Sequence, residues 1–205
     1  MTARFPVVAI YADESCLGNG QVGDNPGGAG VLAEFRHPDG RITRRDLWVS
    51  DPATTNNRMA LRSVIEAFTG IGSKDGRFSV QFTTDSRYIV DGMNSWVFGW
   101  HRNGWKRKTG AIENLALWHD AIRAVDGHDA QWAWVKGHAG HPQNEYANDL
   151  AGRAAGAQDR SHGFVPSEFD RWLTTRRAKG GAKSEVAPFP DADHFRASPS
   201  LPRVG

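Results

Sequence analysis

The stretch 5–30, FPVVAIYADESCLGNGQVGDNPGGAG, carries the strongest structural signal in the 205-residue chain. Residues 6–11 form an apolar run rich in Val, Ile and aromatic side chains, which predicts a strand buried on both faces of a sheet. The run ends on an acid, Asp13, and a glycine-rich loop follows. Because an Asp at a strand end is most often a turn residue bonded to its own backbone, Asp13 alone does not indicate a functional site.

Two more strands are predicted directly after this stretch. Residues 29–36 and 41–49 flank the turn sequence HPDG, whose Pro, Asp and Gly suit a tight connection. The loop 17–28 has no Lys followed by Ser or Thr, so it does not fit a phosphate-binding P-loop. The chain is therefore expected to open with three antiparallel strands.

A helix and a further strand are predicted next. Leu61, Val64, Ile65 and Phe68 have the i, i+3, i+4, i+7 spacing of one helix face. The four residues of the preceding TTNN run, 54–57, are candidate helix caps. Residues 78–84 predict a buried strand that ends on Asp85, the second acid in such a position, and a helix is expected from residue 86 to 93.

Basic and aromatic residues alternate in an interval without acids, between Asp91 and Glu113. Basic groups bind phosphates and indole rings stack on sugars or bases, so this interval predicts a local nucleic-acid surface despite a net charge of only +2. Spacing of i, i+4 places Trp96 and Trp100 on one helix face, and we expect Trp105 to be the most exposed. The residues concerned are Trp96, Trp100, Arg102, Trp105, Lys106, Arg107 and Lys108.

The last part of the domain is predicted as helix 112–125, strand 131–135, a loop and a helix. Glycines flank His138 in this loop, which suits a mobile proton-transfer group better than a core histidine. The helix that follows contains Asn144, Glu145, Asn148 and Asp149.

Four stretches in this order resemble bacterial type 1 ribonuclease H: YADESCLGN, TTNNRM, TDSRY and WVKGHAGHP. The resemblance covers about residues 5–157. It implies an α/β ribonuclease H-like fold, with a five-stranded mixed sheet of order 3-2-1-4-5 flanked by helices. It also implies hydrolysis of the RNA strand of RNA/DNA hybrids with Mg²⁺, or with Mn²⁺ in its place.

The resemblance assigns roles to individual residues. Catalytic positions match Asp13, Asp85, His138 and Asn148, and the metal ligands among them are Asp13, Asp85 and Asn148. Positions that contact the hybrid match Asn19, Thr55, Asn56, Asn57, Trp96, Trp100, Trp105 and Lys106.

Two acids of the family pattern are replaced in this chain. Ala60 stands where the family has Glu, and Asn148 stands where it has Asp. Divalent cations such as Mg²⁺ prefer carboxylate oxygens, so losing two of four charges is expected to weaken metal binding. Glu14 and Asp149 are candidate replacements, although neighbouring residues point to opposite sides of a strand and lie about 100° apart on a helix.

Glu14 lies where strand becomes loop, so its direction is open. We hypothesise that Glu14 supplies a replacement carboxylate; the alternative is a solvated loop residue. Two functions follow: a working ribonuclease H with an altered site, which we favour, or a protein that binds RNA/DNA hybrids without cutting them. A reverse-transcriptase domain is disfavoured because no polymerase-sized segment precedes Met1.

Beyond the ribonuclease H-like domain, 1–157, we expect a linker with a short helix over 158–177 and a disordered tail over 178–205. Phe169, Trp172 and Leu173 lie on one side of that helix. The chain has no apolar run of about 18 residues and no signal-peptide pattern, and its lone Cys16 cannot form an internal disulfide. We therefore expect a cytoplasmic monomer without membrane contact.

Overall fold

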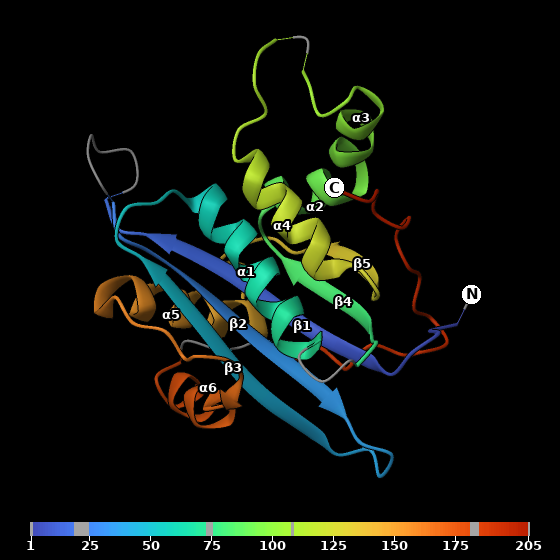
Figure 1. Ribbon diagram of the computed structural model, residues 1–205. Coiled ribbons are helices and arrows are strands. Elements are labelled where there is room, and N and C mark those ends of the chain that lie inside the picture. The colour runs from blue at the N-terminus through green and yellow to red at the C-terminus, as the bar shows by residue number, and fades with distance from the viewer. Residues whose placement is uncertain (1, 19–24, 73–75, 108, 181–184, 205) are drawn as a thin grey trace.

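A six-stranded mixed sheet forms the centre of the computed structural model, which describes residues 2–18, 25–72, 76–107, 109–180 and 185–204 (Figure 1). The strand order is β5-β4-β1-β2-β3-β6. β1 pairs antiparallel with β2, as β2 does with β3 and β3 with β6, whereas β1, β4 and β5 are parallel. The strands are β1 Val7–Cys16, β2 Gly27–Arg36, β3 Ile42–Asp51, β4 Ser79–Thr84, β5 Asp129–Trp134 and β6 Val165–Pro166. The five strands and the order expected from the sequence are confirmed, and β6 is an addition at the edge of β3.

Helices cover both faces of this sheet (Figure 1). α1 and α4 pack together over one face, α5 lies over β1 and β2 on the other, and α6 packs beside α5. The helices are α1 Asn56–Gly72, α2 Arg87–Asp91, α3 Val97–Arg102, α4 Leu115–Val125, α5 Pro142–Ala157 and α6 Phe169–Ala178. A π-helical turn, Gly92–Trp96, joins α2 to α3, so the helical segment expected over 86–93 continues to residue 102.

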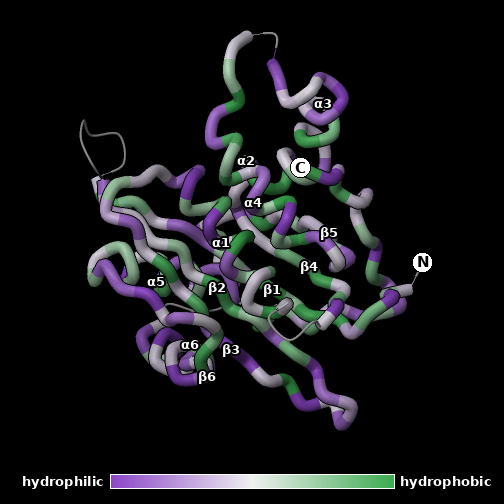
Figure 2. Tube along the Cα trace, viewed as in Figure 1, coloured by the Kyte–Doolittle hydropathy of each residue, from purple (hydrophilic) through white to green (hydrophobic). Residues whose placement is uncertain are grey.

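β1 is buried on both faces, as its sequence predicts. Val8 and Ile10 belong to the core beneath α1 and α4, whereas Ala9 and Tyr11 belong to the core beneath α5. Alternation of side chains along a strand produces this division. Figure 2 shows the result: much of the central strands is hydrophobic, whereas the β2–β3 turn is largely hydrophilic.

α5 lies unusually close to β2 because two strand positions are glycine. A Cβ atom built at Gly28 would lie 2.2 Å from the Ala151 carbonyl oxygen, and one at Gly30 would lie 2.2 Å from the Ala147 carbonyl oxygen. Gly30 pairs with Asp13 across the β1–β2 ladder. The missing side chains therefore allow α5 to approach the strand end that carries Asp13.

The C-terminal residues pack against the domain, although composition favours disorder for 178–205. Residues 185–204, here called the C-terminal strap, run along the domain towards the end marked C in Figure 1. Ser198 N–H donates to the Ala130 carbonyl oxygen at 2.8 Å, and Ala3 N–H donates to Ala192 at 2.8 Å. Phe195 is 3% exposed, and Phe189 packs on the core under α5. A few apolar anchors thus hold a segment whose average composition resembles that of a disordered tail. Among the described residues, no helix is long and apolar enough to cross a membrane.

Candidate active site

Three acids gather where β1 and β4 end. One side-chain oxygen from each of Asp13, Glu14 and Asp85 lies within 4.8 Å of the other two. β1 and β4 are parallel neighbours whose pairing ends at Ala12 and Thr84, so residues 13 and 85 emerge side by side. Three carboxylates at this spacing form a ligand set suited to a hard divalent cation.

Glu14 joins this cluster although it neighbours Asp13 on the strand. β4 ends at Thr84, so it does not pair with β1 beyond Ala12. The Glu14 side chain extends past the end of β4, and one of its oxygens lies within 4.8 Å of oxygens of Asp85 and Asp13. The alternation of side chains therefore does not hold Glu14 away from the cluster.

Burial raises the pKa values of all three acids, and neighbouring carboxylates raise those of Asp13 and Glu14 further. Burial and then the Asp85 carboxylate raise the pKa of Asp13 from its usual 3.8 to about 7, against opposing hydrogen bonds from Glu14 and Asn144. Burial, Asp13 and Asp85 raise the pKa of Glu14 well above its usual range, opposed by a hydrogen bond to Ser86. Burial also raises the pKa of Asp85, whereas its own backbone amide and His138 lower it. A cation at this point would stabilise the ionised forms.

Asn144 on α5 holds the first of these acids. Its Nδ2 atom donates to Asp13 Oδ2 at 3.2 Å and to the Ala12 carbonyl oxygen at 3.3 Å, and the residue is 1% exposed. Sequence reasoning missed this contact. The available signal was the position of Asn144 one turn before Asn148, because residues four apart share a helix face.

Asn148 is half-buried on α5, and Ala60 is 1% exposed in the core beneath α1. Thus α1 contributes no carboxylate from position 60. Asp149 faces away from the acids, since its Oδ2 atom accepts a hydrogen bond from Trp172 Nε1 at 2.6 Å. Of the two candidate replacements, only Glu14 has a side-chain oxygen in the described acid cluster.

The loop that carries His138 lies directly against Asp85. A Cβ atom at Gly137 would lie 2.1 Å from Asp85 Oδ2, so only glycine fits there without displacement. His138 is exposed, has a φ of 52° and is near enough to lower the pKa of Asp85. Trp134, which sequence reasoning left unassigned, is 40% exposed, and its Nε1 atom donates to the Asp85 carbonyl oxygen at 3.0 Å. Its position at the end of β5, beside β4, was the usable signal.

The residues expected to contact substrate are divided between two places. Thr55 and Asn57 are exposed and Asn56 is half-buried at the start of α1, with Thr55 Oγ1 accepting from Arg58 N–H at 3.3 Å as a helix cap. The Oδ1 atom of Asn56 is buried without a hydrogen-bond partner among the described residues. Asn19 lies outside the described residues.

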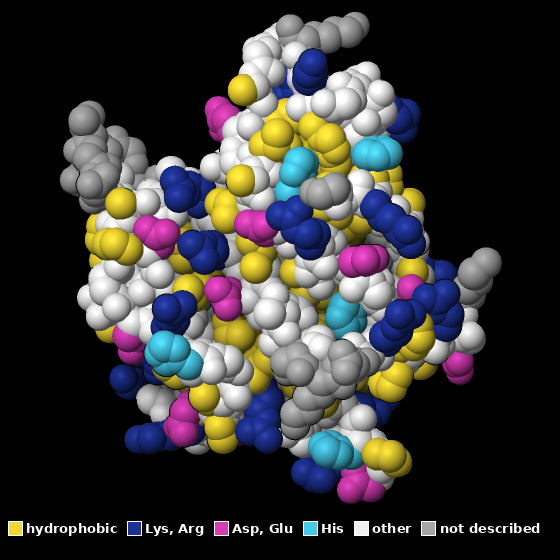
Figure 3. All heavy atoms as spheres, in the orientation of Figure 1, with side chains coloured by type: hydrophobic (Ala, Val, Ile, Leu, Met, Phe, Trp, Pro, Cys, Tyr) yellow, Lys and Arg dark blue, Asp and Glu magenta, His cyan; other side chains and the backbone are white. Residues whose placement is uncertain are grey.

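The second place is the basic arm, residues 96–107, which projects from the domain around α3 (Figure 1). Hydrophobic and basic side chains lie side by side on it (Figure 3). Trp96 and Trp100 have ring centroids 6.0 Å apart and line, with Arg107, a hollow of about 330 Å³. Lys106 is exposed.

The expectation that Trp105 is the most exposed tryptophan of the arm is wrong. Trp105 is half-buried, with its ring centroid 4.4 Å from that of His119, whereas Trp96 is 37% exposed. A φ of 60° turns the Trp105 backbone so that its side chain packs on α4. The exposed indole is therefore the one at the end of the π-helical turn.

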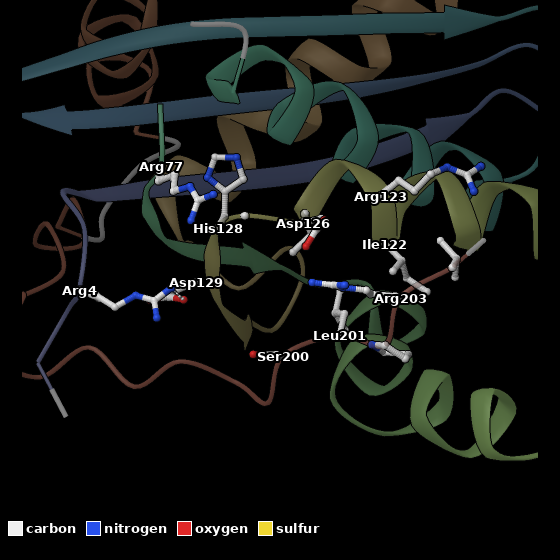
Figure 4. Close-up of a pocket in the computed structure, with 14 residues that line it drawn as sticks. Arg4, Arg77, Ile122, Arg123, Asp126, His128, Asp129, Ser200, Leu201 and Arg203 are labelled. Atoms are coloured by element: carbon white, nitrogen blue, oxygen red, sulfur yellow. Dashed lines mark ion pairs between the residues drawn. The ribbon is translucent and has the colours of Figure 1, made fainter. Parts of the chain in front are cut away.

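A separate cavity of about 530 Å³ lies near the amino end of β5, away from the acids (Figure 4). Four arginines line it, one of them in the C-terminal strap, and Arg4 forms an ion pair with Asp129 at 3.4 Å. Because Asp85 and Trp134 lie at the opposite, carboxyl ends of β4 and β5, this cavity and the acid cluster are different places.

Known proteins resemble this chain in sequence over most of its length. The sequence model of the RNase H family matches residues 6–156. The chain belongs to the ribonuclease H family. Ribonuclease H of Neisseria gonorrhoeae is 42% identical over 149 residues, covering 72% of this chain and 94% of that protein. Ribonuclease H of a Ruegeria species is 38% identical over 160 residues, covering 78% and 97%.

Solved ribonuclease H structures are similar as well. The crystal structure of LC9-RNase H1, described as a type 1 RNase H with the type 2 active-site motif, is 63% identical. It has a TM-score of 0.92 and covers 98% of this chain and 95% of that one. LC11-RNase H1 in complex with an RNA/DNA hybrid is 18% identical, with a TM-score of 0.50 over 74% of this chain and 98% of that one, which supports the fold alone.

Proposed function

We propose that this ribonuclease H family member hydrolyses the RNA strand of RNA/DNA hybrids at a metal site in which Glu14 replaces the family acid lost at position 60. The observation that carries this proposal is the convergence of side-chain oxygens from Asp13, Glu14 and Asp85 within 4.8 Å. The description of LC9-RNase H1 as carrying an altered active-site motif supports it, because that protein is 63% identical.

The donor set fits Mg²⁺, with Mn²⁺ as an alternative. Asp13, Glu14 and Asp85 would hold the ion through carboxylate oxygens, and Asn148 would add an uncharged amide oxygen. A bound divalent ion supplies an activated water and stabilises the leaving oxygen in phosphodiester hydrolysis. Burial and then the Asp85 carboxylate raise the pKa of Asp13 to about 7, and a bound divalent cation would favour its ionised, ligating form.

The other residues bind and orient the hybrid. Thr55, Asn56 and Asn57 place polar groups at the amino terminus of α1, where backbone N–H groups favour phosphate. Trp96 and Lys106 give the basic arm a ring for stacking and a charge for a second stretch of backbone. His138, exposed in its loop beside Asp85, is suited to receive or deliver a proton near the leaving oxygen.

A second candidate function is hybrid binding without cleavage. The observation that favours it is the loss of two family acids, at Ala60 and Asn148, beside substrate-contact residues that are kept. In that case Glu14 would be a carboxylate at the end of β1 without a ligand role.

Cleavage of a labelled RNA/DNA hybrid distinguishes the two functions, with DNA and RNA duplexes as controls, in Mg²⁺ and then Mn²⁺. We expect the unaltered chain to cut the RNA strand, and both Glu14→Gln and Asp13→Asn to abolish cutting. Glu66→Gln is the matched control. Glu66 is a carboxylate on α1 that is not part of the acid cluster, and its Oε1 atom lies 4.0 Å from Arg62 Nη1.

Full cleavage by the Glu14→Gln variant would remove Glu14 from the site. The second candidate function would be favoured if the unaltered chain binds the hybrid without cutting it and an Ala60→Glu, Asn148→Asp double variant gains cleavage.

A further inference from the structure

A buried glutamine connects the C-terminal strap to the first turn of α5. Gln143 is fully buried, and its Nε2 atom donates to the Ala187 carbonyl oxygen at 2.9 Å. Ala187 N–H donates in turn to Gln143 Oε1 at 3.1 Å. One side chain thus pairs with both backbone groups of a strap residue, as a neighbouring strand would.

The polar contacts of Gln143 continue through β2 and β3 to α6. Its side chain lies close enough to Glu34, which is 1% exposed, to offset part of the rise that burial causes in the pKa of that carboxyl. Glu34 Oε1 accepts from Arg44 Nε at 2.7 Å, and another nitrogen of Arg44 donates to Asp170 Oδ1 at 2.9 Å. Because buried polar groups are costly when unpaired, this chain of contacts fixes the strap, the sheet and α6 relative to one another.

α6 also contacts α5 directly. Arg176 pairs with Glu145 at 3.3 Å, and the rings of Tyr146 and Phe169 have centroids 5.3 Å apart. Trp172 donates to Asp149 on the next turn. The strap and α6 therefore both contact the first turns of α5, the part of the helix that carries Asn144.

Asn144 is the next residue after Gln143 and lies in the same turn of α5. It donates to Asp13 Oδ2 at 3.2 Å and so sets the direction of this carboxylate. A movement of the first turn of α5 would change that contact, since helical residues move together. Residues that orient a metal ligand in this way affect metal affinity as well as activity.

We propose that α6 and the C-terminal strap are structural parts of the active site, with Gln143 as the positioning residue that keeps Asn144 on Asp13. Residues 157–204 lie outside the part of the chain that the family model matches, 6–156. The inference rests on the proposed metal site and names the segment that holds one of its ligands in place.

The test is Mg²⁺ affinity, measured by calorimetry on the full chain without substrate, for Gln143→Leu. Leu has a similar volume and cannot hydrogen-bond. We expect Mg²⁺ binding about 10-fold to 100-fold weaker, with kcat recovering at higher Mg²⁺ and the KM for hybrid unchanged. A role in stability alone would lower Tm and leave the Mg²⁺ affinity of the folded protein as it was, and an affinity within about twofold of the unaltered value would overturn the proposal.

A second variant keeps the test usable if Gln143→Leu does not fold. Phe189→Ala leaves Gln143 in place but removes the ring that packs under α5 and stacks against Arg36, 4.6 Å from its centroid. We expect weaker Mg²⁺ binding here too. Ser198→Ala is the control, because its hydroxyl bonds Asn94 at 2.7 Å at the far end of the strap.

If Ser198→Ala weakens Mg²⁺ binding as much as Phe189→Ala, general loosening explains the effect and the proposal fails. A cleavage assay distinguishes failure of the proposed function from failure of the positioning role. An unaltered chain that binds Mg²⁺ but does not cut the hybrid contradicts the proposed function. The dependence of that Mg²⁺ binding on Gln143 would still support the positioning role.

Discussion

Replacing Asp13 with Asn should stabilise the metal-free protein much more at pH 8 than at pH 5. The folded-state pKa of Asp13 is raised from 3.8 to about 7, chiefly by burial and then by Asp85. When the pKa of an acid is higher in the folded state, the unfolded state ionises first as the pH rises. The free energy of unfolding therefore falls between the unfolded pKa and the folded pKa. The cost of ionised Asp13 is therefore absent near pH 4 and complete above about pH 7.

The size of the effect follows from the same shift in the pKa of Asp13. At about 1.4 kcal/mol per pKa unit, ionising Asp13 in the folded protein costs about 4 kcal/mol. Asn removes that cost but disturbs the hydrogen bond from Asn144, at about 1 kcal/mol. A net gain of about 3 kcal/mol corresponds to a rise in Tm of roughly 6–12 °C for a chain of this length.

Thermal unfolding in a chelating buffer at pH 5 and pH 8 measures this difference. Mg²⁺ should raise the Tm of the unaltered protein at pH 8 and should have a smaller effect on the variant, because a ligand stabilises the state that binds it. Glu66→Gln, a surface carboxylate change, should leave both values in place. An equal Tm change at pH 5 and pH 8 would refute the reasoning, since it would show that ionisation of Asp13 is not the cause.

Three further changes test other parts of the site. Gly137→Ala should lower cleavage at least about 10-fold with little loss of stability. A Cβ atom at residue 137 would lie 2.1 Å from Asp85 Oδ2 and would push this carboxylate away from the other acids. An unchanged kcat would contradict this. Trp96→Ala should weaken hybrid binding by about 1–3 kcal/mol, measured by fluorescence anisotropy, whereas Trp105→Ala should mainly lower Tm because that ring packs on His119. Lys106→Ala should reduce the slope of log affinity against log salt by about one, and an unchanged slope would remove it from the phosphate contacts.

Local patterns in the sequence predict the elements that carry the main acids. The apolar run before Asp13 and the one before Asp85 define neighbouring strands, and parallel strands bring their carboxyl ends together. The direction of Glu14 could not be predicted, because it depends on where β4 stops beside β1. The contact of Asn144 with Asp13 was equally inaccessible, since it depends on how closely α5 approaches the glycines of β2.

Composition was the weaker guide for the remaining parts. Gly and basic residues around Trp105 suggested exposure, but its left-handed backbone turns the ring onto α4. Over residues 185–204 the average composition resembles that of a disordered segment, yet Phe189 and Phe195 are anchors that an average does not register. Specific contacts of single residues, rather than composition, determine these two regions.

The C-terminal residues also change how the sheet meets other molecules. β3 and β5 are the outer strands of the main sheet, and open strand edges are templates for pairing with another chain. β6 pairs with Arg45 and Asp46 of β3, and Pro166 in β6 lacks the N–H that a further strand would need. At the opposite edge, the backbone N–H of Ser198 donates a hydrogen bond to the Ala130 carbonyl oxygen of β5. Two segments that follow α5 therefore cover part of each sheet edge, which leaves fewer backbone groups open to intermolecular β-pairing.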